Sequence, residues 1–473
     1  MRLAESKTWK EVVLGSLLGR IALQSGLRKI VANTGWLFVD NLLNVVTGLL
    51  VGAWVARYLG PAQYGVYNYA LAFVSLLTPL AVLGLEDIVI RDIVRAPQDK
   101  DEILGTVFGL KLAGSFLALG LAIGIGHIAR PEDFLTRWLV AVLAGRFVFV
   151  SLSQTLNCWF QSQVQARYAV WAKNIGLFLI ALAKIGLIIA KAPLIAFAWA
   201  ALFEAFVFTV TLAAFHRLSR QRLSTWQINF LRAIRLLKNS WPLIISNLAI
   251  IVYMRIGQVM LGNMVDVKEL GLYSAAARLS ELWYFIPMAI SSSIFPAIVR
   301  SRENQSEMVY RRRMQVFYDV MSAIAYIFVI PLALLAPLVV KTLFGSAYAE
   351  AGEILRIHIW AFVFVSLGVA RGRWLIAGDM VRFEMLAAVL GALLNIGLNF
   401  FLIPRYGALG VAWAVTISQA VSAYLSSVLS KRLWPVFCQA SLSLLVPFRL
   451  FAFGRSLKEI LEQQSLLGND DAL

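Results

Sequence analysis

Long apolar blocks alternate with short polar turns along almost the whole chain. The apolar blocks cover residues 35–56, 64–86, 103–126, 137–157, 173–190, 193–215, 241–262, 271–298, 315–340, 354–376, 383–403 and 407–430. Most approach or exceed the roughly 20 residues that a helix needs to cross a hydrocarbon core of about 30 Å. Because only helices and closed barrels satisfy their backbone hydrogen bonds in lipid, the pattern predicts an all-α polytopic membrane protein with about 12 transmembrane helices.

The polar turns carry positive charge unevenly. If the N-terminus is cytoplasmic, 30 of the 43 Lys and Arg residues lie in inner segments or at the inner ends of spans, and seven lie in outer loops or at the outer ends of spans. Cytoplasmic loops of membrane proteins are enriched in Lys and Arg. The distribution therefore predicts a cytoplasmic N-terminus. It also supports the number of spans, because one missed helix would exchange the inner and outer loops that follow it and remove the difference in positive charge.

The two halves of the chain resemble each other weakly. A shift of 206 residues places GVY at 65–67 on GLY at 271–273, and Asn41 on Asn247. Six spans per repeat would leave both halves facing the same way, related by an axis along the membrane normal. We therefore predict two pseudo-symmetric six-helix bundles around a central cavity, with a cytoplasmic basic linker between them; the three segments are 35–215, 216–240 and 241–430.

Both ends of the chain are expected at the membrane surface. Residues 1–34 place apolar side chains along one side of a helix and basic ones along the other, which predicts a cytoplasmic basic amphipathic segment. Residues 431–473 form a C-terminal apolar segment and tail. Within it, 434–453 is apolar enough to span, but Pro435 and Pro447 interrupt it. We expect a half-embedded or surface helix there; a thirteenth span would place the C-terminus outside.

Composition agrees with this membrane class and removes others. Hydrophobic residues make up 60% of the chain and charged residues 15%, against about 25% charged in soluble domains. The net charge of +17 reflects membrane topology, so we expect no nucleic acid partner. The two cysteines and three histidines lack metal-ligand spacing. No nucleophile with a base, no phosphate loop and no cofactor motif is present. We therefore expect a protein that is not an enzyme and holds no metal or cofactor.

Charged residues inside the predicted spans are the candidates for function, because charge in a bilayer is costly and usually faces a cavity or a partner. Cations outnumber anions there, which favours an anionic cargo such as a phosphate that Arg binds through two hydrogen bonds. The candidates for binding substrate in a cationic cavity are Arg255, Arg146, Arg57, Lys111 and Arg278.

Structural roles compete with each of these assignments. Arg255 lies in the middle of the seventh span, where its alternative role is a salt bridge to Asp40. Arg278 and Glu281 are three residues apart on one helix and would pair with each other. Lys111 lies near a span end, from which its amine reaches the membrane surface. Arg57, beside a turn, either lines the outer mouth of the cavity or anchors the turn.

A second set of residues is considered for coupling or gating. Asp40 and Asn44 share the first span and are candidates for a coupling-ion site. A charged group follows the second span at its cytoplasmic end, where it forms either a helix end with a gate or a cation site. The candidates for coupling or gating are therefore Asp40, Asn44, Glu86, Asp87, Arg91 and Glu281.

Two hairpins carry a more specific resemblance. The first reads YLGPAQYGVYNYA at 58–70 and GLEDIVIRD at 84–92; the second reads YMRIGQVMLG at 253–262 and continues as GLYSAAARLSELWYFIP from residue 271. These stretches resemble the Wzx-type O-antigen and polysaccharide flippases, in the polysaccharide transport family of the multidrug/oligosaccharidyl-lipid/polysaccharide exporter superfamily. The likeness extends from about residue 30 to residue 432. One departure is Gly257, where family members often carry an acidic residue two positions after the arginine.

The resemblance implies a flippase of the bacterial cytoplasmic (inner) membrane. Such proteins move an undecaprenyl-diphosphate-linked oligosaccharide between leaflets by alternating access, for lipopolysaccharide or other O-antigen-like surface polysaccharide. It implies as partners the lipid-linked oligosaccharide, the bilayer, H⁺ or Na⁺ as a coupling ion, and a polysaccharide polymerase with its chain-length machinery. The barrier to overcome is the transfer of a charged diphosphate and polar sugars through hydrocarbon.

Three other functions compete with this one. A multidrug and toxin extrusion-type antiporter would carry acidic cavity residues for cationic drugs, whereas the charge inside these spans is mainly basic. A lipid II flippase would usually bring two more well-formed spans, and only residues 434–453 are available for one. A membrane-embedded glycosyltransferase or polymerase would need a large outer loop or a carboxylate site, and no predicted outer loop is long enough.

Overall fold

The computed structural model describes the backbone of residues 25–449 apart from 164, 220, 305 and 378–379. It describes side chains from Val45 onward, apart from those residues and positions 166, 293, 295–297, 299–301, 303–304, 376–377 and 381. Contacts divide the chain into residues 1–47 and 48–473, and everything below lies within the second part unless stated. Residues 1–24 of the predicted amphipathic segment lie outside the described residues, as does the tail 450–473.

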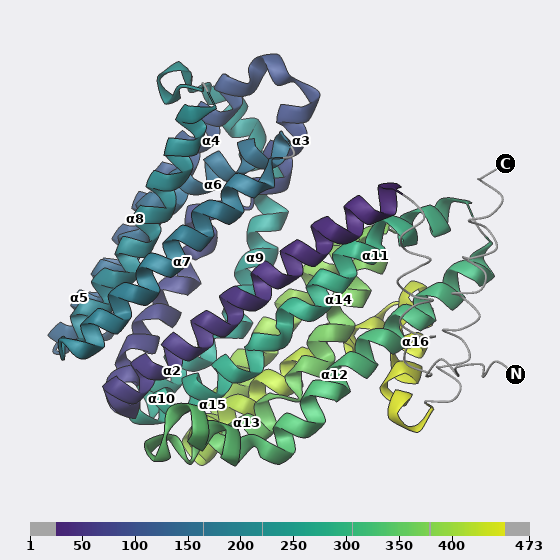
Figure 1. Ribbon diagram of the computed structural model, residues 1–473. Helices are drawn as coiled ribbons and strands as arrows, with labels where there is room; N and C mark the ends of the chain where they lie inside the picture. The colour runs from purple at the N-terminus through teal and green to yellow at the C-terminus, as the bar shows by residue number, and fades with distance from the viewer. Residues whose placement is uncertain (1–24, 164, 220, 305, 378–379, 450–473) are drawn as a thin grey trace, which may run out of the picture. The chain divides into compact units, whose positions relative to one another are not determined.

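The described part of the N-terminal half consists of helices joined by short turns (Figure 1). In chain order they are α2 (Ser25–Val82), α3 (Glu86–Arg95), α4 (Lys100–Ala129), α5 (Phe134–Ala144), α6 (Arg146–Ser162), α7 (Ala166–Ile189) and α8 (Leu194–Leu218). Helix α2 is broken at Gly60, whose φ of 70° lies in the region that glycine adopts without steric cost. Pro61 follows directly. The chain therefore turns at this point, between the first two predicted spans.

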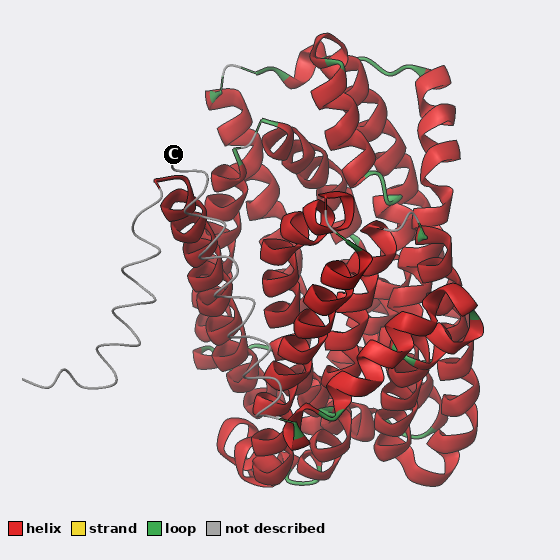
Figure 2. Cartoon of the chain, turned by 90° about the vertical axis from the view of Figure 1, so that its right-hand side faces the viewer, coloured by secondary structure: helices red, strands yellow, loops and turns green. Residues whose placement is uncertain are grey.

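The C-terminal half is built in the same way, and Figure 2 shows helices and loops throughout the described chain. Its helices are α9 (Phe230–Met264), α10 (Val267–Glu281), α11 (Phe285–Asn304), α12 (Glu307–Phe344), α13 (Ala351–His358), α14 (Ala361–Ala377), α15 (Val381–Ala423) and α16 (Trp434–Leu444). Helix α15 is broken at Gly407, with a φ of 53°. It thus contributes two spans from one continuous apolar stretch, as α2 does.

The helical stretches follow the predicted spans. Nine of those within the described residues are long and apolar enough to cross a membrane. Two of them, Val45–Arg95 and Arg382–Leu429, contain the glycine breaks and supply two spans each. Helices α10 and α11, with the short turn Leu282–Tyr284 between them, occupy the predicted eighth span. The prediction of an all-α polytopic membrane protein with about 12 transmembrane helices is confirmed.

Packing is dense within each half. Helices α4, α5, α6 and α8 pack against one another with α7 on α8, while α9 packs along α15, α12 contacts α13 and α14, and α10 contacts α13. The boundaries proposed for the two bundles and the linker stay predictions. Helix α16 has 11 residues and rises about 17 Å. It is too short to cross a bilayer alone, and the membrane position of its segment also stays a prediction.

The internal repeat has a structural counterpart where α2 crosses α10. A Cβ placed on Gly65 would lie 1.7 Å from the carbonyl oxygen of Val267, and one on Gly271 would lie 1.9 Å from that of Pro61. The shift of 206 residues relates Gly65 to Gly271 and also Pro61 to Val267. The two contacts are therefore reciprocal, as expected for segments related by a two-fold axis. Each glycine admits the backbone of the other segment.

Candidate functional site

A polar cavity of about 210 Å³ lies between α2, α9 and α10. It is enclosed by charged, amide and hydroxyl side chains on helices that are otherwise apolar. Its lining consists of Asn68, Leu71, Ala72, Ser75, Arg255, Gln258, Ser274, Ala277, Arg278 and Glu281. Three of the predicted site residues, Arg255, Arg278 and Glu281, thus meet around one space.

Arg255 is paired within this cavity. Its two terminal nitrogens donate to the two carboxylate oxygens of Glu281, at 3.3 and 3.0 Å. Both side chains are largely buried, with 30% and 21% of their surface exposed. Glu281 therefore pairs with Arg255 rather than with Arg278, the pairing considered from the sequence. The side chain of Asp40, the other partner considered for Arg255, lies outside the described residues.

The geometry at Gly257 explains why the acidic residue comes from another helix. A Cβ on Gly257 would lie 2.6 Å from a methyl group of Val411 and 3.1 Å from the side-chain amide nitrogen of Asn399. Both neighbours belong to α15, which packs closely along α9 at this level. A carboxylate at position 257 would have no space. Glu281 supplies the negative charge from α10 instead.

Arg278 lies against the backbone of α2. It donates a hydrogen bond of 2.8 Å to the carbonyl oxygen of Gly48, and a Cβ on Gly52 would approach its guanidinium carbon to 2.8 Å. The absence of a side chain at Gly52 is what lets the guanidinium lie there. Among the described side chains, no carboxylate lies within 4.0 Å of Arg278. Its positive charge is therefore not neutralised by direct contact.

A second charged group lies in the N-terminal half and interacts electrostatically with Arg278, which lines the cavity. Lys184 of α7 interacts electrostatically with Arg146 at the start of α6, with Glu204 of α8 and with Arg278. The buried Tyr67 of α2 interacts with the same Arg146, Glu204 and Arg278. Arg278 thus links the two groups. We use the name chamber for this set of six charged side chains, which are Arg146, Lys184, Glu204, Arg255, Arg278 and Glu281; the last three line the cavity.

The chamber carries excess positive charge. Arg146, Lys184 and Glu204 make no direct ion pair with one another or with any other described residue. The buried Nε of Arg146 also has no hydrogen-bond partner among the described residues. Four cations and two carboxylates leave an excess of two positive charges within the described part of the chamber. Arg146, a predicted binding residue, belongs to this group. Lys184 and Glu204 also belong to it.

Other predicted residues lie elsewhere. Lys111 is fully buried and donates to the side-chain oxygen of Gln154 at 3.2 Å. It interacts electrostatically with Glu86, which accepts hydrogen bonds from two α6 amides. Lys111 is therefore a partnered core residue of the N-terminal half, and its amine does not reach the surface as its alternative role required.

The remaining candidates for binding or gating do not line the polar cavity, or their side chains lie outside the described residues. Asp87 is exposed, and the exposed Arg91 pairs with its neighbour Asp92 at 3.0 Å. These residues form a charged helix end on α3. Arg57 donates to the carbonyl oxygen of Thr342 at the end of α12. The side chain of Asn44 lies outside the described residues, as does that of Asp40.

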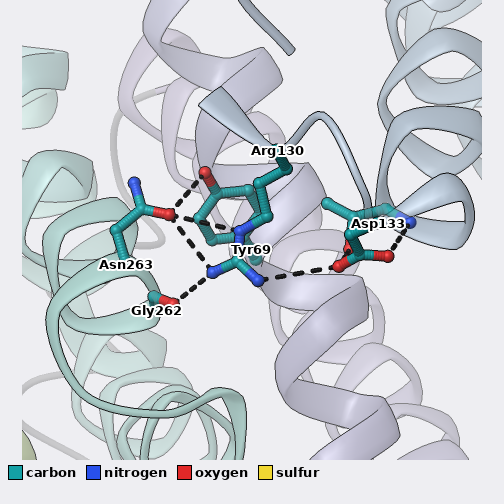
Figure 3. Close-up of polar contacts among 6 residues, drawn as sticks. Tyr69, Arg130, Asp133, Gly262 and Asn263 are labelled. Carbon is teal, nitrogen blue, oxygen red and sulfur yellow. Dashed lines mark hydrogen bonds and ion pairs between the residues drawn. The ribbon is translucent and has the colours of Figure 1, made fainter. Parts of the chain in front are cut away.

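The end of the protein predicted to face outward is closed by contacts between the two halves. Arg130, just after α4, donates to the carbonyl oxygen of Gly262 and, at 3.2 Å, to the side-chain oxygen of Asn263 in α9 (Figure 3). Its guanidinium lies 4.5 Å from the ring centre of Tyr69 and 3.6 Å from Asp133. Tyr69 also donates to Asn263 at 3.0 Å. We call this group the Arg130 clasp.

Further contacts reinforce the same end. The hydroxyl of Tyr348 donates to the carbonyl oxygen of Ala56 at 2.8 Å, beside the contact from Arg57 to α12. The crossing of Gly65 and Gly271 belongs to the same end, because Gly65 lies one helical turn before Tyr69 of the clasp on α2. The sequence indicated the paired glycines but not the clasp. Arg130 and Asn263 are 133 residues apart, and no local pattern connects them.

At the opposite end, the start of α9 is held to α4. Arg232 binds Asp99 at 2.9 Å and Glu102 at 2.6 Å. The side chain of Asn229 accepts hydrogen bonds from the first turn of α9 and so caps that helix. These contacts join the predicted linker to the N-terminal half at the predicted cytoplasmic end.

The chain is similar to known proteins over most of its length. A family model described as polysaccharide biosynthesis protein matches residues 54–353. The capsular polysaccharide biosynthesis protein CapF of Staphylococcus aureus is 21% identical over 83% of this chain and 97% of its own. The probable flippase AglR of Haloferax volcanii is 23% identical over 82% and 81%. A putative O-antigen transporter of Shigella flexneri is 22% identical over 86% and 99%.

Solved structures share the fold at lower identity. The lipid II flippase MurJ, in an inward closed conformation, aligns with a TM-score of 0.68 and 15% identity over 89% of this chain and 95% of its own. An inward-facing multidrug resistance MATE family transporter of the MOP superfamily aligns with a TM-score of 0.63 and 14% identity over 87% and 96%. The family model matches more than half of the chain, and the relatives of this chain are named as proteins of polysaccharide biosynthesis, flippases or O-antigen transporters. The chain is therefore a multi-pass membrane protein that belongs to the polysaccharide biosynthesis protein family.

Proposed function

We propose that this protein is a flippase that moves an undecaprenyl-diphosphate-linked oligosaccharide across the bacterial cytoplasmic membrane, with its N-terminus in the cytoplasm. The observation that carries the proposal is the chamber, whose described side chains leave an excess of two positive charges inside an apolar protein. A diphosphate diester carries two negative charges. Family membership and the named flippases among the relatives support the same activity.

Two kinds of side chain would bind two parts of the cargo: cationic groups would bind the phosphates and neutral amides would bind the sugars. Arg146, Lys184 and Arg278 have no carboxylate in direct contact among the described residues, so their charge is available to phosphate oxygens. The cavity beside them contributes neutral groups from Asn68 and Gln258. Such amides suit the hydroxyls of a sugar. The lipid tail would remain in the bilayer while the chamber replaces the hydration of the headgroup.

Ser274 supports the presence of a polar ligand in the cavity. Its side chain is 5% exposed and lines the cavity, and its hydroxyl has no hydrogen-bond partner among the described residues. Buried hydroxyls in folded proteins are nearly always bonded. A sugar or phosphate oxygen at this place would satisfy it.

Transport would proceed by alternating access between the two halves. The closed end that includes the Arg130 clasp and the glycine crossing would represent one state, in which cargo enters from the cytoplasmic side. Opening that end requires the clasp to break. A coupling ion, H⁺ or Na⁺, and association with a polymerase and chain-length machinery belong to this proposal as further partners. The protein would act as a transporter and catalyse no chemical step.

A lipid II flippase is the second candidate, favoured by the likeness in fold to MurJ. Its cargo carries the same undecaprenyl diphosphate, so the charge of the chamber does not separate the two. A drug antiporter of the MATE type shares the fold but would bind cations. The excess positive charge of the chamber opposes that cargo.

The proposal is tested with purified protein in liposomes that contain a lipid-linked oligosaccharide in both leaflets. An impermeant glycosidase outside the liposomes digests about half of the cargo when no protein moves it, and nearly all of it when cargo crosses. We expect nearly complete digestion with the wild-type protein. In the double variant Arg146→Gln, Lys184→Gln, digestion should stop near one half within the assay time.

The controls distinguish the candidates. The double variant Lys173→Gln, Arg235→Gln removes two exposed charges from α7 and α9 and should behave as wild type. Parallel liposomes with lipid II report the second candidate. Faster movement of lipid II than of the oligosaccharide lipid would reassign the cargo. Movement of neither lipid by folded wild-type protein would refute the flippase proposal.

A further inference from the structure

A larger cavity, separate from the chamber, lies where α8 ends and the predicted linker begins. Its volume is about 690 Å³. Apolar residues of the last turns of α8 form one wall, and polar and basic residues form the other. The lining consists of Val210, Ala213, Ala214, His216, Arg217, Gln221, Arg222, Leu223 and Ser224. We propose that this cavity binds the headgroup of an anionic phospholipid of the cytoplasmic leaflet, as a bound lipid distinct from the transported cargo.

The basic side of the cavity fits a phosphate group. Arg217 and Arg222 both line it, and neither has a carboxylate within 4.0 Å among the described residues. Arginine binds phosphate through two parallel hydrogen bonds. The amine of Lys100 donates to the side-chain oxygen of Gln221 at 2.7 Å and brings a third cation to the edge of the cavity. Asp101 and Lys100 both interact electrostatically with His216, so one carboxylate also lies near the cavity.

His216 provides an independent indication of a polar ligand. The side chain lines the cavity but is only 2% exposed, with its ring 4.8 Å from that of Trp159 and 6.0 Å from that of Trp226. Its Nδ1 atom has no hydrogen-bond partner among the described residues. A buried ring nitrogen without a partner is unusual in a folded protein. A headgroup or glycerol oxygen in the cavity is a suitable partner for it.

The apolar side fits the upper part of an acyl chain. Val210 and Ala214 are exposed in the protein, and both lie on α8, a helix long and apolar enough to span the membrane. The small side chains of Ala213 and Ala214 leave a shallow wall beside the basic groups. Basic pockets at the cytoplasmic ends of membrane helices are suited to anionic headgroups. A soluble phosphate ion would use the arginines but would gain nothing from this wall.

The position gives the lipid a role in the protein. The cavity includes residues 221–224 of the predicted linker, and the same linker continues to Arg232, which holds α9 to α4. A lipid bound there would order the segment that joins the two halves. This inference does not depend on the identity of the transported cargo.

The experiment measures lipid binding to the purified full-length protein by native mass spectrometry. Phosphatidylglycerol and phosphatidylcholine with identical acyl chains are compared. We expect the wild-type protein to retain phosphatidylglycerol preferentially. The double variant Arg217→Gln, Arg222→Gln should bind it about tenfold more weakly, the loss expected from removing charge-assisted hydrogen bonds.

Matched variants separate a site from general surface charge. Arg235→Gln with Lys238→Gln removes the same charge from exposed positions of α9 outside the cavity, and should leave the affinity for phosphatidylglycerol unchanged. Ala214→Leu keeps all charges and fills the apolar wall, so it should weaken binding of phosphatidylglycerol several-fold.

Three results would overturn the proposal. Equal binding of the two lipids to the wild-type protein would exclude headgroup recognition. An equal loss in the α9 control would reduce the effect to surface charge. Complete competition by millimolar inorganic phosphate, with no effect of Ala214→Leu, would identify an ion site instead of a lipid site. Size-exclusion profiles matching the wild-type protein establish that each variant is folded.

Discussion

The cations on the two sides of the chamber differ in whether a carboxylate of the protein pairs with them. On the side of α9 and α10, Arg255 is held by both oxygens of Glu281, so its charge is neutralised within the protein. On the side of α6, α7 and α8, Lys184 interacts electrostatically with Glu204 without a direct ion pair among the described residues, and Arg146 keeps a buried nitrogen that has no hydrogen-bond partner among them. A paired charge holds helices in place, whereas an unpaired charge is available to a ligand. We infer that the first side serves mainly structure and the second mainly binding.

The largest effect on transport should come from the unpaired side. Replacing Arg146 with Gln removes a charge that has no partner to lose among the described residues, so the fold should tolerate it. Each lost contact between a charged donor and a phosphate costs about 1.5–3 kcal/mol. Transport by Arg146→Gln should therefore fall roughly tenfold to a hundredfold. The glycosidase assay measures this, with Lys173→Gln as the control on the exposed face of α7.

The thermal stability of the Arg146→Gln variant shows whether a loss of transport comes from binding or from folding. Removing one of several mutually repelling cations should leave the midpoint of thermal unfolding unchanged or slightly higher. A variant that transports normally would remove Arg146 from the binding site. A variant that loses transport together with stability would show that this side also serves the fold, and the contrast between the two sides would fail.

The paired side should respond in the opposite sense. Glu281→Gln leaves Arg255 largely buried without its counter-ion, which we expect to destabilise the protein by about 2 kcal/mol, less than for a fully buried pair. Arg255→Gln should cost a similar amount, and the two changes together should cost less than their sum. Denaturant unfolding of the four proteins in detergent gives the coupling energy. Strictly additive losses would mean that the pair contributes nothing.

A more local test concerns the space at Gly257, which we used to explain why the carboxylate that pairs with Arg255 belongs to α10. Gly257→Asp introduces a side chain against Val411 and Asn399, and overpacking of this kind costs roughly 1–3 kcal/mol. Adding Val411→Ala should recover part of the loss by making space. An unchanged stability of Gly257→Asp on its own would show that α9 and α15 separate easily here.

The sequence predicted the parts of this arrangement that depend on one stretch of chain. The spans follow from apolar length, and the turns between them follow from the polar residues that interrupt the apolar blocks. The repeat also pointed to Gly65 and Gly271, because a shift along the chain needs no knowledge of contacts. All of these features leave a local or periodic trace in the order of residues.

Pairings between helices left no such trace. Arg255 and Glu281 are 26 residues apart, and the sequence favoured the nearer Arg278 as the partner of Glu281. Lys111 donates to Gln154 on a neighbouring helix, 43 residues away, so this candidate for the cationic cavity is a buried and partnered residue of the N-terminal half. Rotation of each helix about its axis decides these contacts. Apolar residues on nearly every face of a membrane helix leave that rotation unspecified.

The Arg130 clasp tests the contrast at a third arginine and should give the smallest effect. Like Arg255, Arg130 finds its partners within the protein, at Gly262, Asn263 and Tyr69. The contacts of Arg130 join the two halves, whereas those of Arg255 join two helices of one half. Its role is therefore expected in the balance between states. Arg130→Gln should favour the state open at that end by a few-fold, a change of about 1 kcal/mol, and should leave cargo binding unaltered.

Thiol labelling measures this balance. In a protein with Cys158→Ala and Cys438→Ser, Ser274→Cys places a single thiol in the cavity, and an impermeant maleimide is added from the predicted outer side. Labelling should rise a few-fold in Arg130→Gln and stay constant in Arg137→Gln, whose guanidinium contacts only the nearby Phe134 ring among described aromatic partners. Labelling that rises equally in both would reflect loss of charge at the mouth. Labelling that stays constant in both would mean that the other contacts at this end, from the glycine crossing, Tyr348 and Arg57, keep it closed without the clasp.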